Sequence, residues 1–206
     1  MRIGIDFDNT LASYDKAFTE LAQERGLIGM NENKSKQDIR QLARQKENGE
    51  ILWQRLQGEI YGPRMQEAEQ FAGEDQFLRR CAATPGVQIF IISHKTEFGH
   101  FDKTRTNLRD AACQWMRNKG FFDPTKYAIP EKHLFFESTQ QEKVARISSL
   151  QCDVFIDDLV DLFSIPSFPR TTKRILFSDD MPCELIGQVD YICACWSEVE
   201  AIVFGN

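Results

Sequence analysis

The order of apolar and polar residues divides the chain into two kinds of sequence. Short apolar runs of strand length occur at residues 3–5 and again after residue 86, where they alternate with segments of helical spacing. Between these regions, apolar residues recur three and four positions apart, as they do on one face of a helix. Strands that alternate with helices predict a Rossmann-like, doubly wound α/β fold with a mostly parallel sheet. We therefore expect a core of residues 1–11 and 84–206, and an all-helical insertion of residues 12–83 after the first strand.

The insertion is expected to contain about four helices in series, joined by short polar links. Ser35 can cap the second helix, and the pair Gly62-Pro63 stops the third. One or two further helices are expected within residues 65–78, where apolar residues keep the helical spacing. Trp53 and the phenylalanines of this region are interpreted as the core of a compact helical unit.

The second half of the chain predicts the remaining strands and helices. Its first strand, VQIFII at residues 87–92, is continuously apolar, as are strands buried on both faces of a parallel sheet. The helix near residue 138 carries a capping-box pattern, with Ser138 as the cap and Gln141 as its partner. The elements expected after residue 92 are a helix at 104–119, a short strand at 134–136, a helix at 138–150, strands at 153–156, 174–177 and 191–194, and a helix at 196–204.

Composition and charge narrow the classes to which the protein can belong. Its 206 residues include 31 acidic and 25 basic side chains, and the net charge of −6 argues against a non-specific nucleic-acid partner. The longest apolar run is too short for a membrane span, and no signal peptide is expected because charged residues interrupt the start of the chain. Scattered cysteines without a CxxC pair favour reduced thiols in a cytoplasmic protein. They are Cys81, Cys113, Cys152, Cys183, Cys193 and Cys195.

Polar residues follow the ends of several expected strands. The carboxyl ends of parallel strands meet at one edge of a sheet, where open α/β folds bind ligands, so these residues can meet in space. Two acids as close in sequence as Asp6 and Asp8 repel each other unless a cation or a shared proton relieves them. The residues expected at this edge are Asp6, Asp8, Ser93, Asp157 and Asp158, with Lys143 in the first turns of the helix at 138–150.

Together these side chains suit the transfer of a phosphoryl group. Carboxylates offer the hard oxygen ligands that Mg²⁺ takes, and Asp6, Asp157 and Asp158 are the candidates. One carboxylate can attack phosphorus to form an acyl phosphate, while Asp8 can protonate the leaving oxygen and later activate water. The hydroxyl of Ser93 can donate a hydrogen bond to a phosphoryl oxygen, and a lysine can offset the negative charge.

Four segments resemble, in order, the motifs of the haloacid dehalogenase-like (HAD) superfamily. The opening IGIDFDNTL is similar to the first motif, an apolar strand followed by DxDxT and an apolar residue. IFIIS, which ends at Ser93, resembles the second motif, and QQEKVARI with Lys143 resembles the third. VFIDD, with Asp157 and Asp158, resembles the fourth. These segments cover the expected core from end to end.

The resemblance implies a role for each of these residues. It implies that Asp6 is the phosphorylated nucleophile and that Asp8 is the general acid and base. Mg²⁺ would be held by Asp6, by the backbone carbonyl of Asp8 and by Asp157. The helical insertion at 12–83 resembles the superfamily's cap of the first type, which covers the site and selects the substrate.

Structural interpretations stand beside some of these roles. Outside this order of motifs, Ser93 would be read as a turn hydroxyl and Lys143 as a solvated helix lysine. Lys132 also precedes an expected strand and competes with Lys143 for the third motif. Asp158 and Asp161 are either further metal ligands or acids favoured near a helix N-terminus by the helix dipole.

Contacts to the substrate are expected from the insertion and from the loop after the strand at 87–92. His94 and Lys95 are the best candidates for contacting a substrate anion, although surface charge is the commoner explanation for such residues. An insertion of this length suits a small phosphorylated metabolite better than a protein, because closure over the site excludes bulky partners.

We therefore expect a Mg²⁺-dependent phosphatase that hydrolyses a small phosphate monoester through an aspartyl-phosphate intermediate. Phosphomutases of the same superfamily share both aspartates and a helical cap, so mutase activity is an alternative. A phosphonatase would need a buried cap lysine that forms a Schiff base, for which Lys34, Lys36 and Lys46 are candidates. Two alternatives come from other classes, a receiver-like signalling module, in which the acidic residues come in a different order, and a catalytically silent protein that binds a phosphorylated ligand.

Overall fold

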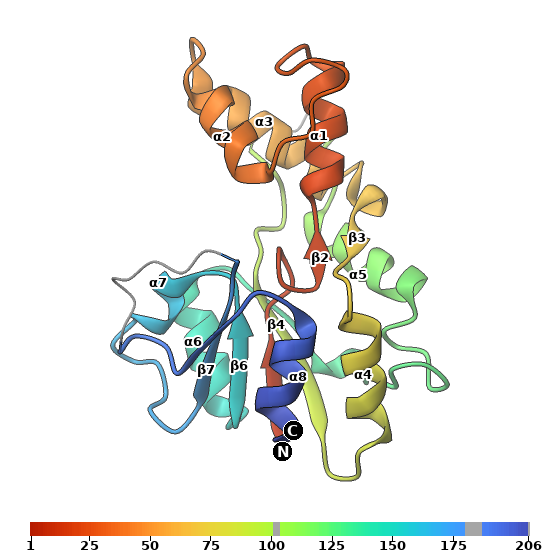
Figure 1. Cartoon of the computed structure of the whole chain (residues 1–206), viewed down its shortest axis with the longest axis vertical. Coiled ribbons are helices and arrows are strands. Elements are labelled where there is room, and N and C mark those ends of the chain that lie inside the picture. Colours follow the sequence, from red (N-terminus) through yellow and green to blue (C-terminus); the bar gives the residue numbers. More distant parts are fainter. Residues whose placement is uncertain (101–103, 180–186, 206) are drawn as a thin grey trace. The chain divides into compact units, whose positions relative to one another are not determined.

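The computed structural model describes residues 1–100, 104–179 and 187–205 (Figure 1). The chain forms two compact units. The first comprises residues 1–12, 70–95 and 119–206, and the second comprises residues 13–69 and 96–118. Each unit is therefore assembled from segments that are distant in the sequence.

The first unit is built on a parallel sheet. Among the described residues, its strands pair in the order β5-β4-β1-β6-β7-β8, and every neighbouring pair is parallel. This confirms the predicted α/β, Rossmann-like sheet. The strands are β1 (Arg2–Ile5), β4 (Gln88–His94), β5 (Leu134–Glu137), β6 (Val154–Asp157), β7 (Lys173–Phe177) and β8 (Tyr191–Cys193).

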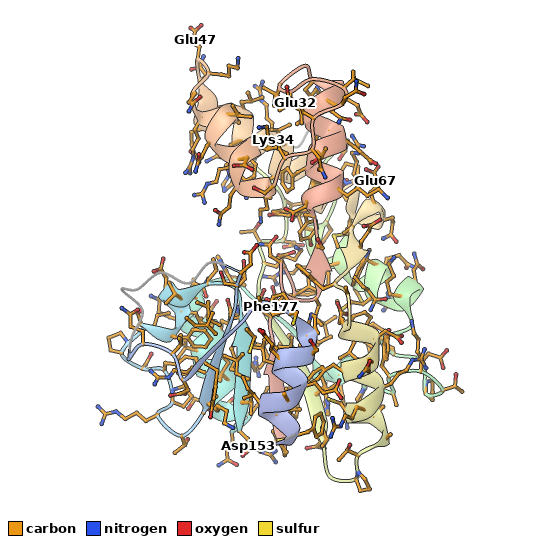
Figure 2. All side chains as sticks on the ribbon, viewed as in Figure 1. Glu32, Lys34, Glu47, Glu67, Asp153 and Phe177 are labelled. Carbon is orange, nitrogen blue, oxygen red and sulfur yellow. The ribbon has the colours of Figure 1, made fainter. Side chains whose placement is uncertain are left out.

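β1 lies at the centre of the sheet, between β4 and β6. Ile3 is in register with Ile89 of β4 and with Val154 of β6. Because the strands run in one direction, the carboxyl ends of β1, β4 and β6 lie side by side at one edge. Figure 2 marks the two edges, since Asp153 precedes β6 at the amino edge and Phe177 ends β7 at the carboxyl edge.

Helices cover the sheet of the first unit. α4 and α8 pack against each other (Figure 1), with the rings of Phe77 and Trp196 4.9 Å apart between centroids and an ion pair of 2.7 Å between Arg80 and Glu200. Val144 and Ile147 of α6 belong to a buried apolar cluster that includes Phe90, Ile92 and Phe155 of the sheet. The helices are α4 (Glu74–Ala83), α6 (Gln140–Ser149), α7 (Val160–Phe163) and α8 (Trp196–Phe204), with a 3₁₀ helix at Glu131–His133.

The second unit is mainly helical. Phe18 stacks on Trp53 with ring centroids 5.1 Å apart, and both side chains are buried, which confirms their interpretation as core residues. Ser35 caps a helix as expected, because its hydroxyl accepts the backbone N–H of Asp38 at 3.1 Å. The helices are α1 (Asp15–Glu24), α2 (Lys36–Arg44), α3 (Gly49–Tyr61) and α5 (Leu108–Lys119), with a 3₁₀ helix at Met65–Glu67.

The segment at residues 65–72 differs from the helix that its apolar spacing predicted. After the 3₁₀ helix, the chain forms the short strand β3 (Glu69–Gln70), which pairs with β2 (Ala12–Ser13) in a two-stranded sheet. The carbonyl of Ala68 accepts a hydrogen bond from the indole of Trp115 at 2.9 Å. That carbonyl is thereby taken out of a helical ladder by a residue far away in the sequence, which local spacing does not reveal.

Two helices begin later than expected. Thr139 rather than Ser138 caps α6, because the Thr139 hydroxyl accepts the N–H of Glu142 at 3.1 Å, while the Glu142 carboxylate accepts the N–H of Ser138 at 3.0 Å. The capping pair is therefore shifted by one residue from the predicted one. α5 begins at residue 108 rather than 104, where the Asn107 side chain accepts the backbone N–H of Arg109 at 3.0 Å.

The two units also divide the chain differently from the expected insertion at residues 12–83. α4 belongs to the first unit, where Phe77 packs on Trp196. Most of α5 belongs to the second unit, where Trp115 bonds to Ala68. Apolar spacing marks a helix but does not say which layer its face will cover.

The described cysteines Cys81, Cys113, Cys152, Cys193 and Cys195 are free thiols, and Cys183 lies outside the described residues. Burial raises the pKa of Cys81, Cys152 and Cys193 to about 12, so these thiols stay protonated and unreactive at neutral pH. In the described parts of the chain, no helix is both long enough and apolar enough to cross a membrane.

Candidate active site

The turn after β1 carries Asp6 and Asp8 at the carboxyl edge of the sheet. Asp6 continues the strand pairing, since its N–H donates to the carbonyl of Ile156 in β6 at 2.9 Å. The chain then turns back on itself, and the N–H of Ala12 donates to the carbonyl of Phe7 at 2.9 Å. The two carboxylates are therefore held at the end of a buried strand by backbone hydrogen bonds on both sides of them.

Three carboxylates meet at this edge. Asp6, Asp157 and Asp158 each offer one oxygen atom, and these oxygens all lie within 4.8 Å of one another. Asp157 is fully buried and accepts the N–H of Leu159 at 2.8 Å, while Asp158 accepts the Asn9 amide at 3.0 Å. Asn9 has a φ of 59°, a left-handed conformation that asparagine tolerates better than most residues.

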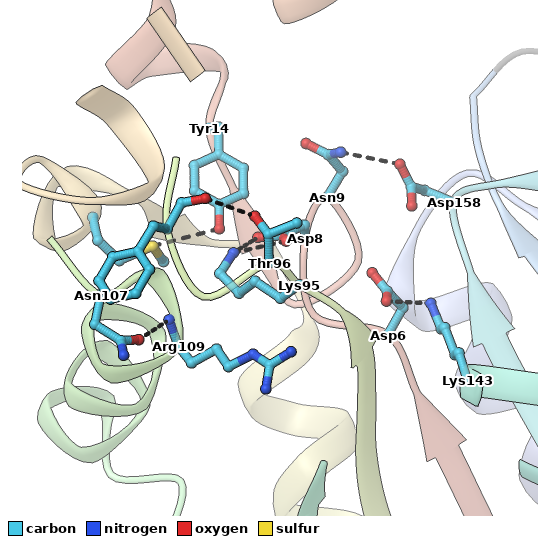
Figure 3. Close-up of polar contacts among 12 residues, drawn as sticks. Asp6, Asp8, Asn9, Tyr14, Lys95, Thr96, Asn107, Arg109, Lys143 and Asp158 are labelled. Atoms are coloured by element: carbon cyan, nitrogen blue, oxygen red, sulfur yellow. Dashed lines mark hydrogen bonds and ion pairs between the residues drawn. The ribbon is translucent and has the colours of Figure 1, made fainter. Parts of the chain in front are cut away.

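Lys143 reaches the same point from α6. Lys143 is 1% exposed, and its ammonium donates to Asp6 (Figure 3). It also donates to Asp157 at 2.6 Å. Lys132, the competing candidate for the third motif, is exposed in the 3₁₀ helix before β5. The structure therefore brings Lys143 to the acids as a buried residue, and it leaves Lys132 at the surface.

Burial and charge shift the pKa values of these groups strongly. Burial raises the pKa of Asp6 well above its ordinary value, and Asp157 and Asp158 raise it further, although Lys143 opposes the shift. Burial alone would lower the pKa of Lys143, but Asp157 and Asp6 outweigh it and hold that pKa above its usual range. The ammonium is therefore a fixed positive charge beside Asp6.

Asp8 faces a second buried lysine instead of the three acids. The Lys95 ammonium lies 2.8 Å from each oxygen of the Asp8 carboxylate, and Lys95 is 3% exposed (Figure 3). The two acids of the opening motif therefore have different partners. Asp6 contacts Lys143, and Asp8 contacts Lys95.

Two hydroxyls near these acids are buried without a hydrogen-bond partner among the described residues. They belong to Ser93, at the end of β4, and to Thr10, in the turn after β1. A buried hydroxyl without a partner is costly, so each is suited to a ligand oxygen. The sequence predicted a role for Ser93. Thr10 is the threonine of the DxDxT motif, and the sequence offered no reason to assign it a role of its own.

Two other candidates lie outside the group of acids. His94 is exposed, and its Nε2 lies 3.1 Å from the carbonyl of Ser138. It follows Ser93 directly in an extended segment, so its side chain points to the opposite face. Asp161 is exposed on α7 and is not one of the three acids that meet among the described residues.

The donor set fits a hard divalent cation. Asp6, Asp157 and Asp158 supply carboxylate oxygens, the ligands that Mg²⁺ takes, and the set contains neither sulfur nor imidazole. With Asp8 included, the four carboxylates outnumber the two ammonium groups by two, which is the charge of such a cation.

In the second unit, the three candidate lysines differ in their surroundings. Lys46 is exposed and Lys34 is half-buried. Lys36 is half-buried, and its ammonium lies 5.5 to 5.9 Å from the ring centroids of Tyr14, Phe18 and Tyr61. Of the three, Lys36 comes nearest to the apolar surroundings that Schiff-base chemistry needs.

Comparison with known proteins finds likeness in structure rather than in sequence. No family model and no curated protein matches the sequence. A predicted phosphatase from Clostridium acetobutylicum matches with a TM-score of 0.61 and 13% identity, over 100% of this chain and 98% of its own. A HAD family hydrolase from Deinococcus radiodurans, with bound phosphate and sodium, matches with a TM-score of 0.58 and 14% identity, over 99% of this chain and 95% of its own.

A third structure, a putative HAD hydrolase from Bacillus subtilis bound to magnesium, matches with a TM-score of 0.57 and 10% identity. The match covers 98% of this chain and 97% of the other. The chain has the haloacid dehalogenase-like fold. Structures with this fold also include a dehalogenase with an intermediate complex, so the fold by itself does not choose among reactions.

Proposed function

We propose that this protein is a Mg²⁺-dependent phosphatase that hydrolyses a small phosphate monoester through an aspartyl-phosphate intermediate. The observation that carries the proposal is the buried group of Asp6, Lys143 and Asp157 at the carboxyl edge of the sheet. Burying charges in this way is costly, and perturbed acids gathered at a ligand-binding edge are typical of catalytic sites. The haloacid dehalogenase-like fold supports a hydrolase of that superfamily.

In the first half of the proposed reaction, Asp6 attacks phosphorus and the bond to the leaving oxygen breaks. Asp8 gives its proton to that oxygen, so an alcohol departs and an acyl phosphate remains on Asp6. Lys143, which contacts Asp6, offsets the negative charge of the phosphoryl group. A Mg²⁺ ion held by Asp6, Asp157 and Asp158 would supply further positive charge to the phosphoryl oxygens.

In the second half, Asp8 takes a proton from water, and the resulting hydroxide attacks phosphorus. Inorganic phosphate leaves, and the carboxylate of Asp6 is restored. The hydroxyl of Ser93 donates a hydrogen bond to a phosphoryl oxygen, a role consistent with its burial and its lack of a partner among the described residues. The Thr10 hydroxyl is also buried without a partner among the described residues, and we propose that it donates to a phosphoryl oxygen as well.

We propose that the second unit selects the substrate. Along the chain, its two segments begin at residue 13, five positions after Asp8, and at residue 96, three positions after Ser93. A helical unit of this size favours a small phosphorylated metabolite over a protein. We do not assign His94 to the substrate anion, because its side chain points to the face opposite Ser93 and its Nε2 lies 3.1 Å from the Ser138 carbonyl.

The experiment that tests this function is a panel of phosphate monoesters assayed for phosphate release, with Mg²⁺ and with a chelator. We expect turnover that requires Mg²⁺, and a loss of about 10³-fold or more in kcat for Asp6→Asn. The matched control is Asp153→Asn, which alters an exposed aspartate at the opposite edge of the sheet (Figure 2). It should retain wild-type activity.

Other outcomes would decide against the proposal. Full activity in Asp6→Asn, or turnover that ignores the chelator, contradicts the mechanism. Transfer of the phosphoryl group from the enzyme to a sugar instead of water indicates a mutase. Tight binding of a phosphorylated ligand without any turnover indicates a silent relative. Phosphate release from a phosphonate that is lost in Lys36→Met indicates a phosphonatase.

A further inference from the structure

Lys95 occupies an unusual place for a lysine. Its backbone N–H donates to the carbonyl of Glu137 at 3.0 Å, which extends the pairing of β4 and β5 by one residue. Its side chain turns inward, is 3% exposed, and ends 2.8 Å from both oxygens of Asp8. Its ammonium also lies 5.3 Å from the centroid of the Phe7 ring.

This pairing differs from the ion pairs at the surface. In the pair of Lys16 and Glu69, the two side chains are 61% and 54% exposed, whereas Lys95 and Asp8 are 3% and 21% exposed. A lysine can usually extend its ammonium into water and avoid the cost of desolvation. The ammonium of Lys95 is instead buried, and it contacts Asp8 in place of water. This buried contact limits the directions in which the Asp8 carboxyl group can point.

A carboxylate has two oxygens with about four lone pairs, so a lysine that contacts both oxygens does not use them all. Because the ammonium of Lys95 contacts both oxygens, it limits rotation of the Asp8 carboxyl group about its side-chain bonds. The sequence suggested instead that Lys95 contacts a substrate anion directly. Its burial against Asp8 favours an indirect role.

We infer that Lys95 is a positioning residue for Asp8, which holds the carboxyl group in one orientation both when it gives its proton to the leaving oxygen and when it takes a proton from water. The inference rests on the proposed function, in which Asp8 carries that proton. It also predicts that the loss of kcat without Lys95 depends on the substrate, because leaving groups differ in how much they need a proton in order to depart. Esters of alcohols depend on it strongly, and activated aryl esters depend on it weakly.

The test measures kcat and KM for two probes, p-nitrophenyl phosphate and an alkyl phosphate from the panel that the wild-type protein hydrolyses. Lys95→Met keeps the length of the side chain and removes its charge. We expect kcat for the alkyl ester to fall by about 10- to 100-fold while KM changes by less than about threefold, because orientation rather than binding is lost. For p-nitrophenyl phosphate we expect a fall of less than about threefold. Lys132→Met is the matched control, since that lysine is exposed, and it should behave as the wild-type protein does.

A double-mutant cycle separates action through Asp8 from other effects. In the Asp8→Asn background, adding Lys95→Met should change kcat by less than about twofold, because the carboxylate that Lys95 positions is already gone. The double variant also replaces a charged pair by a neutral one, so it should fold even if Lys95→Met alone does not. Thermal unfolding of the four proteins checks this, and we expect their midpoints to be non-additive.

Several outcomes would overturn the inference. Equal losses on both esters, losses that multiply in the double variant, or a change in KM alone would each show that Lys95 does not act through Asp8. Additive unfolding midpoints would show the same without any activity measurement. If the wild-type protein hydrolyses no ester at all, the proposed function fails and the inference falls with it, whereas an active wild-type enzyme with multiplicative losses overturns the inference alone.

Discussion

Two buried carboxyl groups in the first unit differ in the charge of their neighbours. Asp6 lies among charged groups, and Glu74 lies among neutral hydrogen-bond donors. Asp6 faces Lys143 and two further acids at the carboxyl edge of the sheet. Glu74, in the first turn of α4, is fully buried and accepts hydrogen bonds from the Gln70 amide at 2.9 Å and from the N–H of Phe71 at 3.2 Å. Burial raises the pKa of both groups, and for Glu74 it raises the pKa to about 8.

The comparison shows that burial by itself does not identify a catalytic acid. Neutral donors hold Glu74, which stays protonated at neutral pH and needs no counter-ion. Around Asp6, the carboxylates outnumber the ammonium groups, and a divalent cation would balance the remaining negative charge. The charge of the neighbours, rather than the depth of burial, separates a structural carboxyl from a candidate site.

The largest effect should follow from removing the charge beside Asp6. In Lys143→Met, two buried carboxylates lose their cation, and we expect a loss of about 3 to 5 kcal/mol in the free energy of unfolding without Mg²⁺. Activity should fall by about 10²-fold or more, because the charge that offsets the phosphoryl group is gone. Urea unfolding and kcat measure the two effects. Lys16→Met, at an exposed pair, is the control, and an equal loss in both variants would show that the charge beside Asp6 has no special role.

The next effect concerns Glu74 and pH. The folded chain keeps this proton up to a pH of about 8, whereas the unfolded chain releases it near 4.5, so stability falls as the pH rises between these values. The loss should approach roughly 3 to 5 kcal/mol at pH 8. Glu74→Gln has no proton to lose and should not share this decline, although exposed Asp75 and half-buried Lys126 stay in place.

Urea unfolding of the wild-type protein and Glu74→Gln at pH 5 and pH 8 measures this difference. The variant should gain stability relative to the wild-type protein as the pH rises. If the free energy of unfolding changes equally with pH in both proteins, Glu74 is held as a carboxylate, and the contrast with Asp6 disappears.

The smallest effect should come from a carboxylate at the surface of the same unit. Asp190 pairs with Arg174 at 3.0 Å, and the two side chains are 39% and 28% exposed. Asp190→Asn should lower the free energy of unfolding by about 1 kcal/mol or less, because water and salt screen such a pair. Urea unfolding at low and high salt checks this, and a larger loss that salt leaves unchanged would contradict it.

Much of the fold could be predicted because local patterns carry it. The apolar runs at residues 3–5 and 87–92 predicted central parallel strands, since a strand buried on both faces must be apolar throughout. Of the one or two helices expected within residues 65–78, α4 forms, whereas residues 65–72 are not an α-helix, because the Ala68 carbonyl is taken by Trp115 from a distant part of the chain. The predicted capping pair of α6 was wrong by one residue, since Ser138 and Thr139 are both favoured cap residues and residue type alone does not place the helix start.

The candidate site could be predicted in part for a similar reason. Asp6 follows β1, while Ser93 and Asp157 lie at the ends of β4 and β6, and the convergence of strand ends at one edge brings them together. Glu74 gave no comparable signal, because a glutamate in the first turn of a helix is ordinary at the surface. Its burial depends on what packs over α4.

Local sequence patterns identify the segments that form the sheet and the polar residues at its carboxyl edge, because strand period and strand direction are local properties. The packing of the folded chain is needed to show that Lys143 rather than Lys132 is buried among the acids, and that Lys95 faces Asp8 across 87 positions of sequence. The partner of a charged side chain depends on which distant surfaces pack together and exclude water. That exclusion of water is a property of the assembled fold rather than of any single segment.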